Sequence, residues 1–127
     1  MNRIQFLNID LDLESDEDIS DLVAEIGTKL VVMRDHTVSG VHHASFETTL
    51  STENEIIAEY SSVISGLTET SKRLWERCSK RSFDFGYDSG DAPNDFRSVI
   101  SAESVSKIKE MGAEIAITIY PIAHEDT

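Results

Sequence analysis

The chain has 127 residues, of which 24 are acidic and 11 are basic, so its formal net charge at pH 7 is −13. This charge argues against binding to nucleic acid or anionic membranes, and it indicates either simple solubility or a basic partner. No apolar run approaches the roughly 18 residues of a membrane span, and the first residues lack the apolar region of a secretory signal. The single cysteine, Cys78, excludes an internal disulfide, so we expect a cytoplasmic protein.

A chain of this length buries roughly two-thirds of its unfolded surface, which is enough for one core. No internal repeat, linker or low-complexity segment divides it. We therefore expect residues 1–127 to form a single domain, with a frayed tail at residues 123–127.

The first third of the chain predicts a strand and then a helix. Apolar and polar residues alternate over residues 3–13, which is typical of a strand with one apolar face and one wet, acidic face. Residues 15–27 follow a helical period that begins at Ser15. Acidic residues at positions 16–18 suit the first turn of such a helix, and Gly27 suits its end.

The middle third predicts short strands and two helices. Residues 28–33 indicate a strand or an extended segment, residues 34–40 a loop or hairpin turn, and residues 41–50 a strand. Thr52 begins a helix, with Glu55 at the spacing of a capping box.

A shorter helix is predicted over residues 70–78, with Cys78 as a packed thiol on its apolar side. The only basic cluster of the chain overlaps its end, and we expect it to pair within the molecule or to form a solvated helix end. The basic cluster comprises Lys72, Arg73, Arg77, Lys80 and Arg81.

The last third predicts strand, loop, strand, helix and strand. These elements span residues 83–87, 88–95, 96–100, 101–112 and 113–120. Ile115, Ile117 and Ile119 share one face of the last strand, and we expect them to be buried in a central strand. The helix and the strands flanking it predict a right-handed crossover with two parallel strands. The complete pattern predicts an α+β fold: a mainly antiparallel sheet of about five strands with helices packed on one face.

Chemical motifs are few. Asp84, Asp88, Asp91 and Asp95 could suggest a divalent metal, but their spacing does not match a calcium loop, so we expect no metal and no cofactor. His42 and His43 are adjacent on a strand and therefore point to opposite faces, and we expect the histidines to lie at the surface. No nucleophile elbow, Walker loop or dinucleotide fingerprint is present in the sequence.

Two stretches resemble a bacterial family of small α+β domains of unknown function. They are the run FDFGY at residues 83–87 with the Gly/Pro loop after it, and the run GAEIAITIYP at residues 112–121; the acidic helix at residues 15–27 is a weaker match. Domains of this kind are similar to the immunity proteins of polymorphic and contact-dependent growth inhibition toxins. The resemblance implies an α+β fold and toxin neutralisation, and it supplies no catalytic residues.

The leading hypothesis is an immunity protein, not an enzyme, that binds a basic toxin domain such as a nuclease through an acidic surface. Its alternatives are a small hydrolase or metal-dependent enzyme using Asp84, Asp88 and Asp91, and a regulatory ligand-binding domain. The simpler interpretation of the acidic residues is helix-start electrostatics and a wet sheet face. The candidate partner-binding residues are Asp10, Asp12, Glu14, Asp16, Glu17, Asp18, Asp84, Asp88, Asp91 and Asp95.

Overall fold

The computed structural model describes residues 2–121, which form a five-stranded sheet and four helices. In chain order the elements are β1 (Gln5–Ser15), α1 (Ser20–Ile26), β2 (Val31–Val38), β3 (Val41–Glu47), α2 (Glu53–Ser65), α3 (Glu69–Arg77), β4 (Lys80–Asp88), α4 (Ala102–Glu110) and β5 (Glu114–Tyr120). The tail predicted at residues 123–127 lies outside the described residues. Within residues 2–121 no helix has the length and apolar content needed to cross a membrane.

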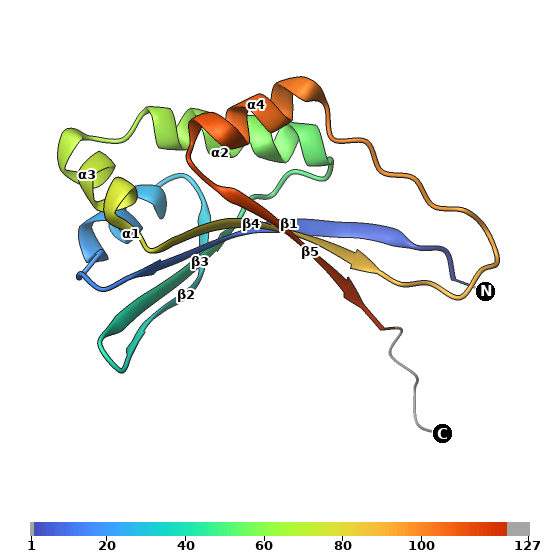
Figure 1. Ribbon diagram of the computed structural model, residues 1–127, viewed down its shortest axis with the longest axis horizontal. Coiled ribbons are helices and arrows are strands. Elements are labelled where there is room, and N and C mark those ends of the chain that lie inside the picture. The colour runs from blue at the N-terminus through green and yellow to red at the C-terminus, as the bar shows by residue number, and fades with distance from the viewer. Residues whose placement is uncertain (1, 122–127) are drawn as a thin grey trace.

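The strands lie in the order β2-β3-β1-β4-β5. Every neighbouring pair is antiparallel except β4 and β5, which run parallel and are joined through α4. The helices lie together on one side of the sheet (Figure 1). The prediction of a mainly antiparallel α+β fold with helices on one face is therefore confirmed.

The core forms where the apolar faces of β1, β3 and β4 meet the helix layer. Ile9 and Leu11 on β1 are completely buried, as the predicted alternation requires, but Leu7 is 47% exposed because the register is irregular between Phe6 and Asn8. Tyr60 of α2 is also completely buried, and its hydroxyl lies 2.7 Å from the carbonyl oxygen of Ile9 and 3.0 Å from that of Phe46. Burial raises the pKa of Tyr60 well above its usual value, so this hydroxyl remains a donor that ties α2 to both strands.

The helix predicted from Ser15 is wrong at its start. β1 continues to Ser15, which is buried opposite His42, and α1 begins only at Ser20. The hydroxyl of Ser15 accepts from the backbone N–H of Glu17, and the carboxylate of Asp18 accepts from that of Ser20. Short polar side chains bond their own backbone in this way in turns, so the acidic residues stabilise a turn and not a helical first turn.

The loop predicted at residues 34–40 is mostly strand. β2 covers residues 31–38, and the reversal is confined to Ser39 and Gly40, whose φ angles are 51° and 80°. Two positive φ angles in succession are typical of the tight hairpin turn that matches strand twist. Every residue of β2 is exposed, so its sequence carries no alternation that could have announced the strand.

The strand predicted at residues 96–100 is absent. The chain instead runs without regular structure from residue 89 to residue 101. Side chains hold this segment: the ring of Phe96 packs edge-on against Tyr87, and the hydroxyl of Ser98 bonds that of Tyr87 at 3.0 Å. The parallel crossover is real, but it starts from β4 and not from residues 96–100.

β5 is an edge strand, so the prediction of a buried central strand is wrong. Ile115, Ile117 and Ile119 are 42%, 63% and 63% exposed. Alternation identified their common face correctly, because they lie beside Phe83, Phe85 and Tyr87 on the helix side. Period two shows which residues share a face, but it does not show whether another element covers that face.

The later helices begin near the predicted residues. Ser101 caps α4 by accepting from the backbone N–H of Ser104. Thr52 precedes α2 but its side chain makes no cap bond, so the predicted capping box does not form. Gly112 ends α4 with a φ of 69°, the left-handed conformation usual after a helix.

Candidate functional site

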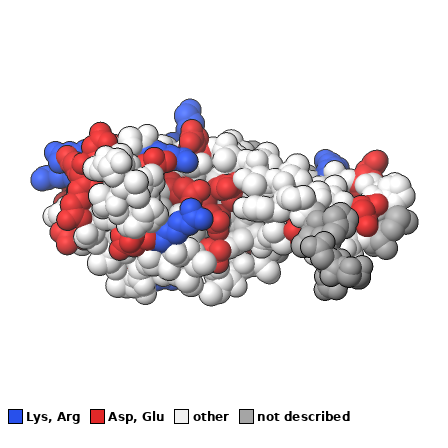
Figure 2. All heavy atoms as spheres, turned by 90° about the horizontal axis from the view of Figure 1, so that it is seen from below, with Lys and Arg blue, Asp and Glu red and all other residues white. Residues whose placement is uncertain are grey.

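The second face of the sheet is the main candidate surface. All the helices lie on the opposite side in Figure 1, so no helix within residues 2–121 covers it. We call this surface the open face. Figure 2 views the molecule from this side and shows acidic side chains gathered near its middle, with basic side chains among them.

Strand alternation brings four carboxylates together on the open face. Asp10 and Asp12 come from β1, Glu47 from β3 and Asp84 from β4, and these four residues form what we call the acidic patch. Asp10 and Asp84 are direct partners in the antiparallel ladder. Like charges placed directly opposite one another destabilise a sheet, so the patch carries an energetic cost in the free protein.

Asp10 occupies the centre of the acidic patch. Partial burial, followed by the charges of Glu47, Asp12 and Asp84 in that order, raises the pKa of this carboxyl to about 6. Its buried Oδ1 atom has no hydrogen-bond partner among the described residues. A buried polar atom without a partner costs free energy, so a donor brought to this position would be stabilising.

Hydroxyl groups position two other members of the patch. The carboxylate oxygens of Asp84 accept from Thr118 Oγ1 at 2.7 and 3.0 Å, and Asp12 Oδ1 accepts from Ser45 Oγ at 2.8 Å. These bonds fix the carboxylates without neutralising them, because both donors are uncharged.

A mixed row crosses the open face beside the patch. His36 pairs with His43, His43 with Glu14, and Glu14 with Lys80, each on the next strand. The imidazole rings stack with centroids 5.2 Å apart, His43 Nδ1 lies 3.9 Å from Glu14, and Lys80 Nζ lies 3.4 Å from Glu14. A shallow hollow of about 430 Å³ lies over this row, and Arg34 also lines the hollow. Glu14 therefore has basic neighbours, and Arg34 also reaches the acidic patch, because it pairs with Ser45, which in turn pairs with Asp12.

The histidine prediction is partly wrong. His42 and His43 do point to opposite faces, but His42 is buried on the helix side. Its Nδ1 accepts from the backbone N–H of Ile19 at 3.1 Å, and its Nε2 lies 2.6 Å from Asp35. This histidine joins β3 to the start of α1 and to β2, which is a structural role.

The acidic turn at positions 16–18 lies at the end of β1 and outside the patch. Asp18 accepts from both the hydroxyl and the backbone N–H of Ser20, and these bonds lower its pKa. Glu17 lies 3.6 Å from Arg77 of α3. Two of the three predicted residues in this turn thus have internal partners.

Three other predicted residues lie at or beyond the other end of β4. Asp88 is the last residue of β4 and lies opposite Gln5, and Asp95 lies in the irregular segment. Asp91 accepts a hydrogen bond from the backbone N–H of Asn2, and its own N–H donates to the carbonyl oxygen of Asn2 at 2.7 Å. Asp91 therefore holds the start of the chain.

Convergent catalytic groups are not found in the part of the chain that the structure describes. Among residues 2–121 no group of three or more histidine, cysteine, aspartate or glutamate side chains could hold a metal ion. Asp84 and Asp88 share a face of β4 but lie four residues apart along the strand, and Asp91 lies beyond its end, bonded to Asn2. The arrangement needed for the predicted hydrolase site, several groups directed at one substrate position, is missing from these three residues.

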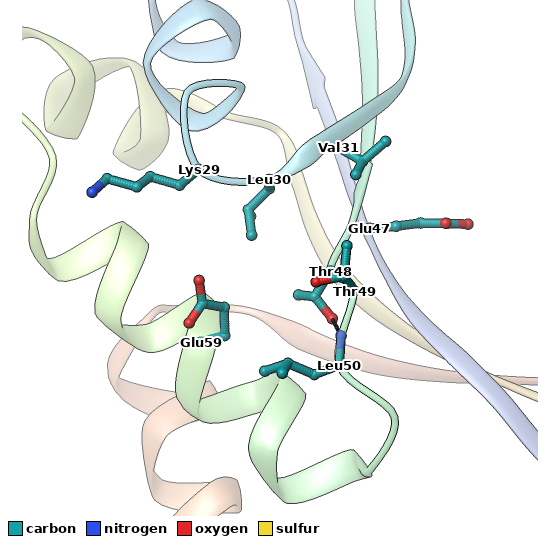
Figure 3. A pocket seen from close by; sticks show the side chains of 8 residues that line it. All are labelled: Lys29, Leu30, Val31, Glu47, Thr48, Thr49, Leu50 and Glu59. Atoms are coloured by element: carbon teal, nitrogen blue, oxygen red, sulfur yellow. Dashed lines mark hydrogen bonds between the residues drawn. The ribbon is translucent and has the colours of Figure 1, made fainter.

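Figure 3 shows a small pocket of about 130 Å³ between the start of β2, the end of β3 and α2. Glu59 and Leu50 border it, while Lys29 and Glu47 point away from it in opposite directions. The eight lining residues are Lys29, Leu30, Val31, Glu47, Thr48, Thr49, Leu50 and Glu59. They include no histidine or cysteine, and two of the charged side chains, Lys29 and Glu47, point away from the pocket.

Three of the five residues of the basic cluster, Arg77, Lys80 and Arg81, have partners within the molecule. Arg81 donates to the carbonyl oxygens of Gly112 at 3.0 Å, Trp75 at 2.9 Å and Cys78 at 3.1 Å. Cys78 is buried, and its burial raises the pKa of the thiol to about 11, so the predicted packed thiol is confirmed. Arginine at these carbonyls stabilises the ends of α3 and α4.

Sequence analysis identified three members of the acidic patch and missed Glu47. The alternation of β3 could have identified Glu47, because it places this residue on the same face as Ser45, which pairs with Asp12 of β1.

Comparisons with protein-family models, with curated proteins and with solved structures find no match to this chain.

Proposed function

We propose that this protein binds a basic protein partner through the acidic patch of its open face, and that it acts as a cytoplasmic immunity protein against a toxin domain. The observation that carries the docking proposal is Asp10: a partly buried carboxylate, surrounded by three other carboxylates, with a buried oxygen that lacks a donor among the described residues. A nuclease is the favoured toxin class, because nucleases bind phosphate through cationic clefts that an acidic surface can occupy.

The energetics of the free patch favour a cationic partner. Desolvation and like charges both oppose ionisation of Asp10, and a lysine or arginine placed beside it would relieve both effects. A charge-assisted hydrogen bond to its Oδ1 atom would also satisfy the orphaned acceptor. Docking of a cation therefore removes a cost that is already present in the folded protein.

The family resemblance supports the immunity part of the proposal. The stretches that carry it, FDFGY and GAEIAITIYP, contribute most of β4 and all of β5. The first stretch includes Asp84 of the acidic patch, and the second includes Thr118, which holds that carboxylate. The hydrolase alternative has less support, because Asp84, Asp88 and Asp91 do not share one site.

Neutralisation of the toxin tests the proposal. The candidate toxin is the product of the neighbouring open reading frame. Its purified toxic domain is titrated with the wild-type protein and with two double variants. Asp12→Asn with Asp84→Asn alters the acidic patch, while Asp16→Asn with Asp95→Asn removes the same charge from exposed positions elsewhere. Both pairs retain oxygen acceptors, so hydrogen bonding from Ser45 and Thr118 can persist.

The wild type and the Asp16/Asp95 control should inhibit the toxin equally, and the patch variant should need a higher concentration. Equal inhibition by all three proteins would remove the acidic patch from the proposal. A wild type that inhibits nothing made by its genomic neighbour would remove the immunity function itself.

A further inference from the structure

One edge of the sheet presents an uncovered apolar strand. Ile115, Ile117 and Ile119 of β5 continue the row of buried aromatic residues on β4, but they are 42%, 63% and 63% exposed. Figure 1 shows β5 running out from under the helix layer. The apolar layer of the core thus extends beyond the helices that cover it, and β5 has no strand on its outer side within residues 2–121.

The two edges of the sheet differ in how they are protected. β2 has a register irregularity between Val32 and Arg34 and carries charged side chains at Arg34 and Asp35. Bulges and charges are the usual features that prevent edge strands from pairing with other chains. β5 has an unbroken seven-residue register and one charged residue, Glu114, although the chain as a whole carries −13.

We propose that β5 pairs antiparallel with β5 of a second copy of this chain, which joins the two sheets into one of ten strands. The register is centred on Ile117, since only this alignment pairs all seven residues of the strand with one another. Ile115 then lies opposite Ile119 of the second copy, and Ala116 opposite its Thr118. The contact is two-fold symmetric, so it closes as a dimer and does not propagate.

A second copy satisfies the requirements of this edge at every position. The occupant must be a strand, because an edge offers backbone donors and acceptors in a row. It must also place apolar residues on the helix side, and the antiparallel copy brings its own three isoleucines to that side. Glu114 meets Tyr120 of the second copy and not another carboxylate, so like charges do not oppose each other along the pair.

The dimer is independent of the proposed toxin docking. The isoleucines lie on the helix side, whereas the acidic patch lies on the open face. Joining two β5 strands leaves both patches exposed on the same side of the extended sheet.

Sedimentation equilibrium of the purified protein without any partner tests the association. The wild type should show twice the chain mass of 14.2 kDa, and Ile117→Lys should show the single mass. Val38→Lys is the matched control, because Val38 is 52% exposed on the other edge strand, and it should remain dimeric. Circular dichroism and thermal melts establish that each variant is folded.

A cysteine variant tests the register and does not depend on a charged substitution. In the proposed register, the thiol of Ile117→Cys lies opposite the same thiol of the second copy, within the Cα separation that a disulfide spans. The thiol of Thr118→Cys lies opposite Ala116 of the second copy and has no thiol to pair with. The native Cys78 is buried and does not compete. Ile117→Cys should form a covalent dimer under mild oxidation at protein concentrations where Thr118→Cys does not.

Three results would overturn the proposal. The first is a wild type that stays monomeric up to about 1 mM, where even a weak contact associates. The second is an Ile117→Lys variant that is folded and still dimeric. The third is cross-linking of Thr118→Cys as readily as Ile117→Cys, which would exclude the register centred on Ile117.

Discussion

Asp10 of β1 and Asp84 of β4 lie directly opposite each other in the antiparallel ladder, on the face of the sheet that carries no helix. Two carboxylates in this relationship repel each other, and partial burial of Asp10 adds to the cost of ionising it. The pair therefore links the stability of the free protein to its proposed docking function.

The first prediction concerns stability and pH. The pKa of Asp10 rises to about 6 in the folded protein, above the value near 4 in an unfolded chain. The stability of the folded protein that depends on a protonated Asp10 is therefore fully present below about pH 4 and is lost as the pH rises through 6. Asp10→Asn removes this titration. At pH 7 the variant should unfold with a free energy about 1 kcal/mol above that of the wild type, a value reduced from the full pKa shift because solvent screens a half-exposed carboxylate.

Urea denaturation at a series of pH values between 4 and 7 measures the difference between the two proteins. The advantage of Asp10→Asn should shrink as pH falls and vanish near pH 4. A variant that is less stable than the wild type at pH 7, or an advantage that is independent of pH, would contradict the position given to Asp10.

The second prediction concerns Tyr60. Its hydroxyl lies between the carbonyl oxygens of Ile9 and Phe46, so Tyr60→Phe leaves buried acceptors short of a donor. The free energy of unfolding should fall by about 1–3 kcal/mol. Tyr120→Phe is the control: that side chain is 44% exposed, and its loss of a hydroxyl should change stability by less than about 0.5 kcal/mol. Equal effects in denaturant titrations would show that the Tyr60 hydroxyl bonds contribute little.

The third prediction separates backbone strain from crowding at two glycines. Gly40 and Gly90 both have positive φ angles, 80° and 64°. A Cβ at Gly40 would have no neighbour within 4 Å, whereas one at Gly90 would lie 2.5 Å from the backbone nitrogen of Ile4. Gly40→Ala should therefore cost about 1 kcal/mol, and Gly90→Ala should cost more, because it also displaces the start of the chain. Comparable losses in thermal melts would show that the close approach to Ile4 is absent in solution.

The sequence predicted the faces of the strands better than their places in the sheet. Alternation grouped Ile9 with Leu11, and Ile115 with Ile117, and both groupings are correct. It could not show that β1 is central and β5 is at an edge, because strand order depends on connections and not on local period. The exposed β2 was harder still, since a strand with both faces in water has no period to detect.

The acidic patch could be predicted in part. Asp10, Asp12 and Asp84 were candidates from sequence, but so were the acidic residues of the turn and of the later loop, and charge alone does not separate them. The structure separates them through the ladder, which places Asp84 and Glu47 beside Asp10 and leaves Asp16 and Asp95 elsewhere. Long-range strand pairing of this kind is not written in any local stretch of the chain.

The most direct measurement of the central claim is the rate of association with the neighbour-encoded toxin domain as a function of salt. If the acidic patch docks, Asp12→Asn with Asp84→Asn should slow association roughly tenfold at low salt and flatten its dependence on ionic strength. Asp16→Asn with Asp95→Asn, which removes the same charge elsewhere, should keep the rate and the slope of the wild type. Equal slowing by the two double variants would show that only the overall charge matters, and an unchanged patch variant would place the docking surface outside the open face.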